Sequence, residues 1–94
     1  MPFEWDDQKS LTNEQKHGID FEAAQSLWLD GRRVEIEMAF PGEKRWALIA
    51  SIEGTTWAAI YTVRDEKIRL ISVQRARPKE VRLYEEEKPR KVGG

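Results

Sequence analysis

Cysteine is absent from this chain of 94 residues and histidine occurs once, and these two shortages exclude several kinds of small protein. Without cysteine there is neither a disulfide framework nor a thiolate metal site, and a lone histidine argues against structural zinc. No apolar run approaches the roughly 20 residues that a membrane helix needs. The N-terminus has neither the basic start nor the apolar stretch of a secretory signal. The sequence therefore predicts a cytoplasmic protein that needs no metal or cofactor and does not enter a membrane.

The residues that are present suit a small folded domain with a dense polar surface. Charged residues make up 35% of the chain and hydrophobic ones 39%, and four Trp, three Phe and two Tyr supply bulky core material. That composition excludes a disordered chain, and the length allows one modest core. We expect a single domain over residues 1–88. Because residues 89–94 begin with Pro89 and end on two glycines, we expect them to form a mobile tail.

The net charge of −1 hides an uneven distribution along the chain. Residues 1–30 carry seven acidic and two basic side chains, whereas residues 65–84 carry six basic and three acidic ones. A basic C-terminal half can bind a polyanion. An acidic first half that pairs with its own basic second half explains the same pattern equally well.

Two helices are predicted in the first third of the chain. Residues 7–17 read as a helix that Asp6 or Asp7 caps, with Gly18 well placed as the left-handed residue just past its end. Asp20 then caps a second helix of about eight residues. Its buried stripe, at helical spacing, consists of Phe21, Ala24, Leu27 and Trp28.

Four strands and a closing helix are predicted in the rest of the chain. Alternating or β-branched segments, separated by turn residues, cover residues 33–38, 46–52, 55–63 and 67–73. Their short connections favour an antiparallel meander, since parallel strands need long crossovers. Pro78 suits the first position of the last helix, whose Val81 and Tyr84 can pack on the sheet. The fold class is therefore α+β.

The pair Lys16-His17 at the end of the first helix has two interpretations. His17 can exchange a proton near neutral pH, and Lys16 can hold a phosphate. Lys and His are also common at helix ends, where their charge complements the negative end of the dipole. The residues alone favour this second interpretation.

Four arginines in or near the last two strands are also ambiguous: Arg64, Arg69, Arg75 and Arg77. Guanidinium groups grip phosphate and stabilise the charge of a phosphorane, but solvated strand arginines also oppose edge aggregation. Arg69 and Arg75 are an even number of residues apart, so an undistorted strand would place both on one side. A bulge between them would break that parity.

Other polar and aromatic residues have equally plain structural explanations. Glu80 and Tyr84 are four apart on the last helix and share a face. They can act as acid and base, but packing and solvation explain them as well. The four tryptophans can stack on bases, although core or partner-anchoring roles are favoured in so small a domain. No phosphate loop, nucleophile elbow or metal motif is present.

Two blocks of sequence follow the pattern of one family. The first block is Phe3-Glu4-Trp5-Asp6, Lys9, Asn13, Lys16-His17-Gly18-Ile19, Phe21 and Ala24. The second block is Arg45, Tyr61-Thr62, Arg64, Ile68-Arg69-Leu70-Ile71-Ser72, Arg75-Ala76, Glu80 and Tyr84. In this order, over residues 3 to about 85, they resemble the BrnT toxins of bacterial toxin–antitoxin systems.

This resemblance implies a RelE-like fold with two N-terminal helices, a twisted four-stranded antiparallel sheet and a C-terminal helix. It also implies a metal-independent ribonuclease that blocks translation, in which the 2′-hydroxyl of the RNA attacks the adjacent phosphate. The implied partners are RNA, on or off the ribosome, and a cognate BrnA-like antitoxin, through which alone the protein would contact DNA.

The resemblance also suggests roles for the residues singled out above. Arg69 and Arg75 would stabilise the transition-state phosphate, and His17 would transfer a proton with help from Lys16. The cations that would guide RNA are Arg45, Arg64, Arg77 and Lys79.

Two positions depart from the family pattern. Where the family reads Ala-Arg-Arg-Ala, this chain has Val73-Gln74-Arg75-Ala76, so that Gln74 replaces one arginine, and Ala50 stands where glycine is common. Two alternative functions remain open: a nuclease-inactive BrnT-like module that binds a protein, and a co-regulator of transcription that binds DNA with its antitoxin. The chain lacks a helix-turn-helix signal, which disfavours direct binding to double-stranded DNA.

Overall fold

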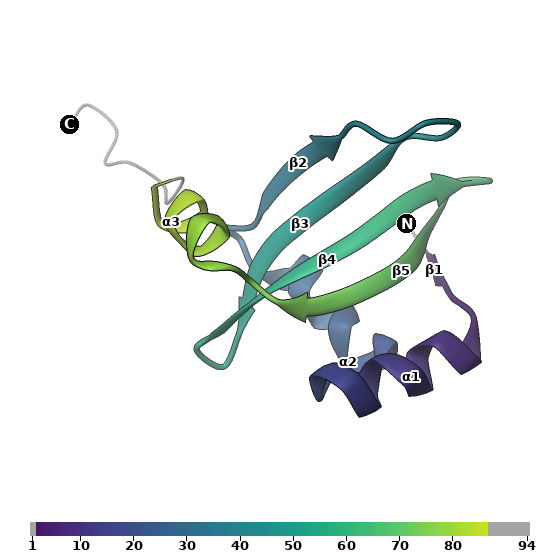
Figure 1. The fold of residues 1–94 in the computed structure, drawn as a ribbon, viewed down its shortest axis with the longest axis horizontal. Coiled ribbons are helices and arrows are strands. Elements are labelled where there is room, and N and C mark those ends of the chain that lie inside the picture. The colour runs from purple at the N-terminus through teal and green to yellow at the C-terminus, as the bar shows by residue number, and fades with distance from the viewer. Residues whose placement is uncertain (1, 87–94) are drawn as a thin grey trace.

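A five-stranded sheet with the strand order β1-β5-β4-β3-β2 organises the structure, a computed structural model that describes residues 2–86 (Figure 1). The elements are β1 (Phe3–Glu4), α1 (Asp7–His17), α2 (Phe21–Ala24), the 3-10 helix η1 (Gln25–Leu29), β2 (Val34–Met38), β3 (Arg45–Ile52), β4 (Thr55–Arg64), β5 (Lys67–Arg75) and α3 (Pro78–Glu86). The predicted α+β class and the antiparallel meander β2 to β5 are confirmed, consistent with a RelE-like arrangement. The domain end at residue 88 and the tail over 89–94 lie outside the described residues.

The prediction of four strands is wrong by one short strand at the N-terminus. β1 pairs in parallel with β5 through Phe3↔Ile68 and Glu4↔Arg69. The backbone N–H of Ile68 also donates to the carbonyl of Pro2 at 2.8 Å. A strand of two residues is too short to show the alternation by which strands are recognised in a sequence, so only its distant partner reveals it.

Local capping explains where the first helices begin and end. The Asp6 carboxylate accepts the N–H groups of Gln8 and Lys9 at 2.8 and 3.2 Å, and Gly18 follows α1 with a left-handed φ of 81°. Asp20 caps the next helix, but α-helical geometry lasts only for four residues before η1 takes over. The expected single second helix is therefore a short α-helix continued by a 3-10 helix. Its predicted buried side chains still pack on the sheet.

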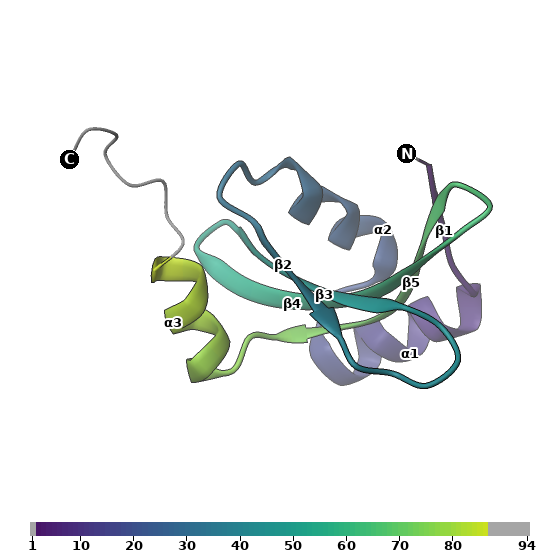
Figure 2. The same ribbon diagram turned by 90° about the horizontal axis from the view of Figure 1, so that it is seen from above.

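The N-terminal helices α2 and η1 cover one face of the sheet, which we call the helix-covered face (Figure 2). The main core lies between these helices and the sheet. It includes Phe21 and Leu27 from the helices and Leu48, Leu70 and Val73 from the strands, each at most 2% exposed. This burial of apolar surface supplies most of the stability of such a domain.

The opposite face, which we call the open face, is covered within residues 2–86 at one end by α3. There Tyr84 packs on Ala47, Ile49 and Ala58 in a second, smaller core. Figure 2 shows α3 at that end of the sheet, while α1 runs beside β5 at the other side. The part of the open face between them is accessible.

A β-bulge in β5 decides which side chains reach the open face. The register passes from Ile60↔Ser72 to Tyr61↔Leu70, which leaves Ile71 as an extra residue. Arg69 consequently lies opposite Thr62 on the open face, whereas Arg75 lies opposite Trp57 on the helix-covered face. The expectation from an undistorted strand, that both arginines share a side, is wrong because of this bulge.

The outer edge of β5 is completed by a side chain as well as by β1. The Asn13 amide donates to the carbonyls of Val73 and Ile19 at 2.8 and 2.9 Å and accepts the Val73 N–H at 3.0 Å. Asn13 is 6% exposed. One amide from α1 therefore imitates a neighbouring strand and fixes α1 against β5. Over residues 2–86, no helix has the length and apolar character needed to cross a membrane.

Candidate functional site

A row of polar side chains crosses the accessible part of the open face. Cross-strand pairing places Glu4 beside Arg69 and Arg69 beside Thr62. The Thr62 hydroxyl, 3% exposed, donates at 2.6 Å to the carbonyl of Lys44, which directly precedes Arg45. Strand alternation turns Arg45 to the same face, because its neighbour Trp46 packs on the helix-covered face. Arg45 and Arg69 thus lie on either side of a buried threonine.

Arg45 is held in place by two contacts. Its Nε lies 3.1 Å from Glu43 Oε2, and its guanidinium carbon is 3.6 Å from the centroid of the Phe40 ring. Glu43 also contacts Arg64 at 3.4 Å. The hydrogen bond from Arg45 lowers the pKa of Glu43 most. Burial opposes it, and the bond from Arg64 with the charges of both arginines makes the net shift downward. This carboxylate therefore orients two cations at once.

Arg69 has a looser partner. Its Nη1 is 3.4 Å from Glu4 Oε2, and both side chains are 32% exposed. The separation exceeds the 2.7–2.9 Å of a charge-assisted hydrogen bond. The guanidinium carries five N–H groups, so Arg69 keeps donors for a ligand on the open face.

The predicted pair Lys16 and His17 lies in a hollow of about 230 Å³ between α1 and β5. The residues lining it are Gln8, Lys9, Thr12, Asn13, Lys16, His17, Ile71 and Ser72. The bulge brings Ile71 into this hollow, and Ser72 belongs to the open face. Lys9 was not predicted as a site residue, although its spacing of seven from Lys16 places both on one helix face.

The remaining predicted residues do not join this surface. The guanidinium of Arg75 lies 5.8 Å from the ring of Trp57, on the helix-covered face. Arg77 is exposed just before α3, and Lys79 lines a hollow between α3 and Ile36 at the far end of the open face. Glu80 accepts the N–H of Arg77 at 2.8 Å, as in a capping box.

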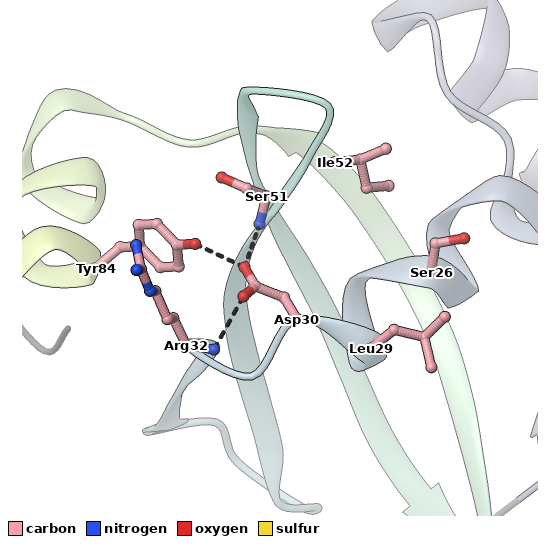
Figure 3. A pocket seen from close by; sticks show the side chains of 7 residues that line it. All are labelled: Ser26, Leu29, Asp30, Arg32, Ser51, Ile52 and Tyr84. Carbon is pink, nitrogen blue, oxygen red and sulfur yellow. Dashed lines mark hydrogen bonds between the residues drawn. The ribbon is translucent and has the colours of Figure 1, made fainter. Parts of the chain in front are cut away.

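Tyr84 is occupied by a buried contact between α3 and the end of η1 (Figure 3). Its hydroxyl donates to Asp30 Oδ2 at 2.6 Å, and Asp30 also accepts the N–H groups of Ser51 and Arg32, each at 2.9 Å. Burial raises the pKa of Asp30, but the bond from Tyr84 and the two backbone bonds outweigh it and lower the pKa overall. Burial, followed by the bond to Asp30, raises the pKa of Tyr84. This clasp anchors α3.

The tryptophans serve the core, as favoured from the sequence. Trp57 is 8% exposed, and Trp5, Trp28 and Trp46 pack against the main core from its margin. Trp46 stacks on Tyr61 with ring centroids 5.6 Å apart, and Trp28 meets Tyr61 edge-on at 5.2 Å. Burial, followed by the hydrogen bond to Glu35, raises the pKa of Tyr61, which keeps its hydroxyl a donor.

These features define a class of protein: a small α+β domain with one helix-covered sheet face and one open face that carries arginines. Residues 5–80 match the family described as "Ribonuclease toxin, BrnT, of type II toxin-antitoxin system". The match spans more than half of the chain, so the chain belongs to the BrnT family of ribonuclease toxins. The resemblance seen in the sequence is confirmed. A search of curated proteins finds no match.

Proposed function

We propose that the open face binds single-stranded RNA and cleaves it by attack of the RNA's own 2′-hydroxyl. The observation that carries this proposal is the placement of Arg45, Arg64 and Arg69 on three adjacent strands of an uncovered face. Guanidinium groups bind phosphate oxygens and stabilise the charge that develops on them. The helix-covered face packs against α2 and η1 in the main core.

In the reaction that we propose, Arg69 binds the scissile phosphate. The 2′-oxygen loses its proton to a base and bonds to phosphorus, and the bond from phosphorus to the 5′-oxygen breaks. The leaving 5′-oxygen takes up a proton, and His17, assisted by Lys16, is our candidate for proton transfer in this reaction. The products are a 2′,3′-cyclic phosphate and a 5′-hydroxyl. No step needs a metal ion, so cleavage should persist when EDTA is present.

The other cations guide the RNA toward Arg69 in this proposal. Arg45 and Arg64 are oriented by Glu43 beside the row, whereas Lys79, beside Ile36, and the exposed Arg77 would guide the RNA from outside the row. Glu80 and Tyr84 already hold α3 in place, so their predicted role as acid and base is not part of this mechanism.

The proposed partner is a BrnA-like antitoxin that covers the open face in the cytoplasm and supplies all contact with DNA. Type II antitoxins are proteins that neutralise their toxin, and the family description names this system. Inducing the chain without its antitoxin should arrest bacterial growth and reduce translation. Unchanged growth with folded protein present would favour the alternative of a nuclease-inactive binding module.

That alternative has one observation in its support. Gln74 replaces an arginine of the family pattern, and its pairing with Ala58 places it on the open face. This chain therefore presents one cation fewer on the proposed RNA surface, and we expect slower cleavage rather than none.

The test compares chemistry with binding in two variants. Arg69→Ala should lower the single-turnover cleavage rate by about a hundredfold, because one lost donor to a transition-state oxyanion costs about 3 kcal/mol. Lys79→Ala should instead weaken RNA binding, with little effect on the chemical step. If both variants fold and behave alike, Arg69 is an ordinary phosphate contact and the mechanism is wrong.

A further inference from the structure

Glu4 is a carboxylate that meets Arg69, the cation proposed to bind the scissile phosphate, on the open face. It ends β1, and the parallel register sets it directly beside Arg69. The neighbouring Phe3 packs into the main core, so strand alternation turns Glu4 to the open face. Its side chain is 32% exposed, which leaves the carboxylate accessible to a ligand.

The contact between these two side chains leaves both with free hydrogen-bonding capacity. Among residues 2–86, Arg69 is the ion-pair partner of Glu4, through one carboxylate oxygen at 3.4 Å. A surface ion pair of this kind contributes only about 0–1 kcal/mol to stability, so folding alone gives little reason for it. A phosphate bound by the remaining N–H groups of Arg69 would lie next to the carboxylate.

The geometry points to Glu4 as the general base of the cleavage reaction, an inference that rests on the function proposed above. In RNA, the attacking 2′-hydroxyl belongs to the ribose directly bonded to the scissile phosphate. A phosphate held by Arg69 therefore brings that hydroxyl within reach of the neighbouring carboxylate. A positioned base at hydrogen-bond distance is the geometric requirement for this kind of catalysis.

The proton and electron pairs balance without any further reactant. The Glu4 carboxylate takes the proton of the 2′-hydroxyl as the 2′-oxygen bonds to phosphorus. The bond to the 5′-oxygen then breaks, and this oxygen takes a proton from solvent, because His17 ends α1 while Glu4 precedes its first residue. Arg69 stabilises the negative charge on the non-bridging oxygens meanwhile. Glu4 returns its proton to solvent.

A general base and a residue that only positions Arg69 differ in a measurable way. A glutamine still accepts a hydrogen bond from Arg69 but does not take up a proton. The charged groups that face Glu4 from β5 are Arg69 and, two residues along the same face, Lys67. Both are cations, so Glu4 is the proton acceptor among these three groups.

The experiment measures single-turnover cleavage of a short RNA, and its affinity, for Glu4→Gln as a function of pH. The expected result is a rate about 10² to 10⁴ times lower at neutral pH, with RNA affinity unchanged or tighter because a negative charge is lost. The fall in wild-type rate on acidification should be absent from the variant. Glu4→Asp should recover part of the rate.

Glu14→Gln is the matched control, because Glu14 is an exposed carboxylate on α1 outside the hollow and the row. It should cleave as the wild type does. Circular dichroism and the Tm show whether Glu4→Gln keeps the fold. If it does not, the cleavage rate of Glu4→Asp tests the inference instead.

Two results would overturn the inference and can be told apart. If Glu4→Gln cleaves at the wild-type rate, or its rate still falls on acidification, while Arg69→Ala is slow, then Glu4 is not the base but the proposed function stands. If the wild type does not cleave RNA, or Arg69→Ala cleaves as fast, the proposed function itself fails and Glu4 falls with it.

Discussion

Single residues on β5 decide which cations an RNA can meet. The extra residue Ile71 turns Arg69 to the open face and Arg75 to the helix-covered face, although both belong to one strand. The same bulge places Gln74 on the open face. The side on which a side chain lies, rather than its charge alone, therefore determines its part in the proposed mechanism.

The Gln74 position leads to a gain-of-function prediction. Gln74→Arg should tighten RNA binding and steepen its salt dependence by about one phosphate contact, since a cation is added to the proposed surface. Filter binding or fluorescence anisotropy over a range of salt concentrations measures both. Gln25→Arg adds the same charge within η1, on the other side of the sheet, and should leave the salt slope unchanged. Equal effects of the two changes would contradict the assignment of the surface.

Among the elements, α3 depends on the clasp between Tyr84 and Asp30. Tyr84→Phe should lower the free energy of unfolding by about 1.5–3 kcal/mol at neutral pH, the usual contribution of a hydrogen bond to a charged group. Because the pKa of Asp30 is lowered, its contribution to stability is present above pH 3.8, the ordinary pKa of an aspartate, and is lost as the pH falls through the lowered pKa.

The raised pKa of Tyr84 acts at the other end of the pH range. Its contribution to stability is fully present below pH 10.0, the ordinary pKa of a tyrosine, and is lost as the pH rises through the raised pKa. Chemical denaturation across pH should therefore show a difference between wild type and Tyr84→Phe that is largest near neutrality and shrinks in acid. A difference independent of pH would show that the bond from the Tyr84 hydroxyl does not depend on the charge of Asp30.

Helix α1 depends in turn on the amide of Asn13. Asn13→Ala would leave the buried N–H and carbonyl of Val73 without these partners, at about 1–3 kcal/mol for each group. We expect the free energy of unfolding to fall by about 2–4 kcal/mol. Gln15→Ala, two residues along on the exposed surface of α1, is the control and should change little. Similar stabilities of the two variants would refute the role of Asn13 at the sheet edge.

At the scale of the whole molecule, local signals in the sequence predicted most elements but not their long-range pairing. The bounds of α1 followed from Asp6 and Gly18, because capping acts within a few residues. The strands of the meander were predicted from alternating or β-branched segments between turn residues. By contrast, β1 is too short to carry a pattern, and its partner in β5 is far along the chain.

The candidate site was predictable only in part, for the same reason. The arginines and the pair Lys16 and His17 were identified by residue type and family resemblance. The bulge at Ile71, which separates Arg69 from Arg75, comes from the register of β4 with β5. Glu4 appeared in the family pattern without a role, because its contact with Arg69 exists only once β1 has paired.

The central claim is that the open face, and not the helix-covered face, is where RNA is cleaved. The most direct measurement is the single-turnover cleavage rate of Arg69→Ala beside that of Arg75→Ala, two equal charge losses on one strand and on opposite faces. We predict a rate about a hundredfold lower for Arg69→Ala and a rate close to wild type for Arg75→Ala. Equal losses in both variants, or a larger loss in Arg75→Ala, would contradict the claim.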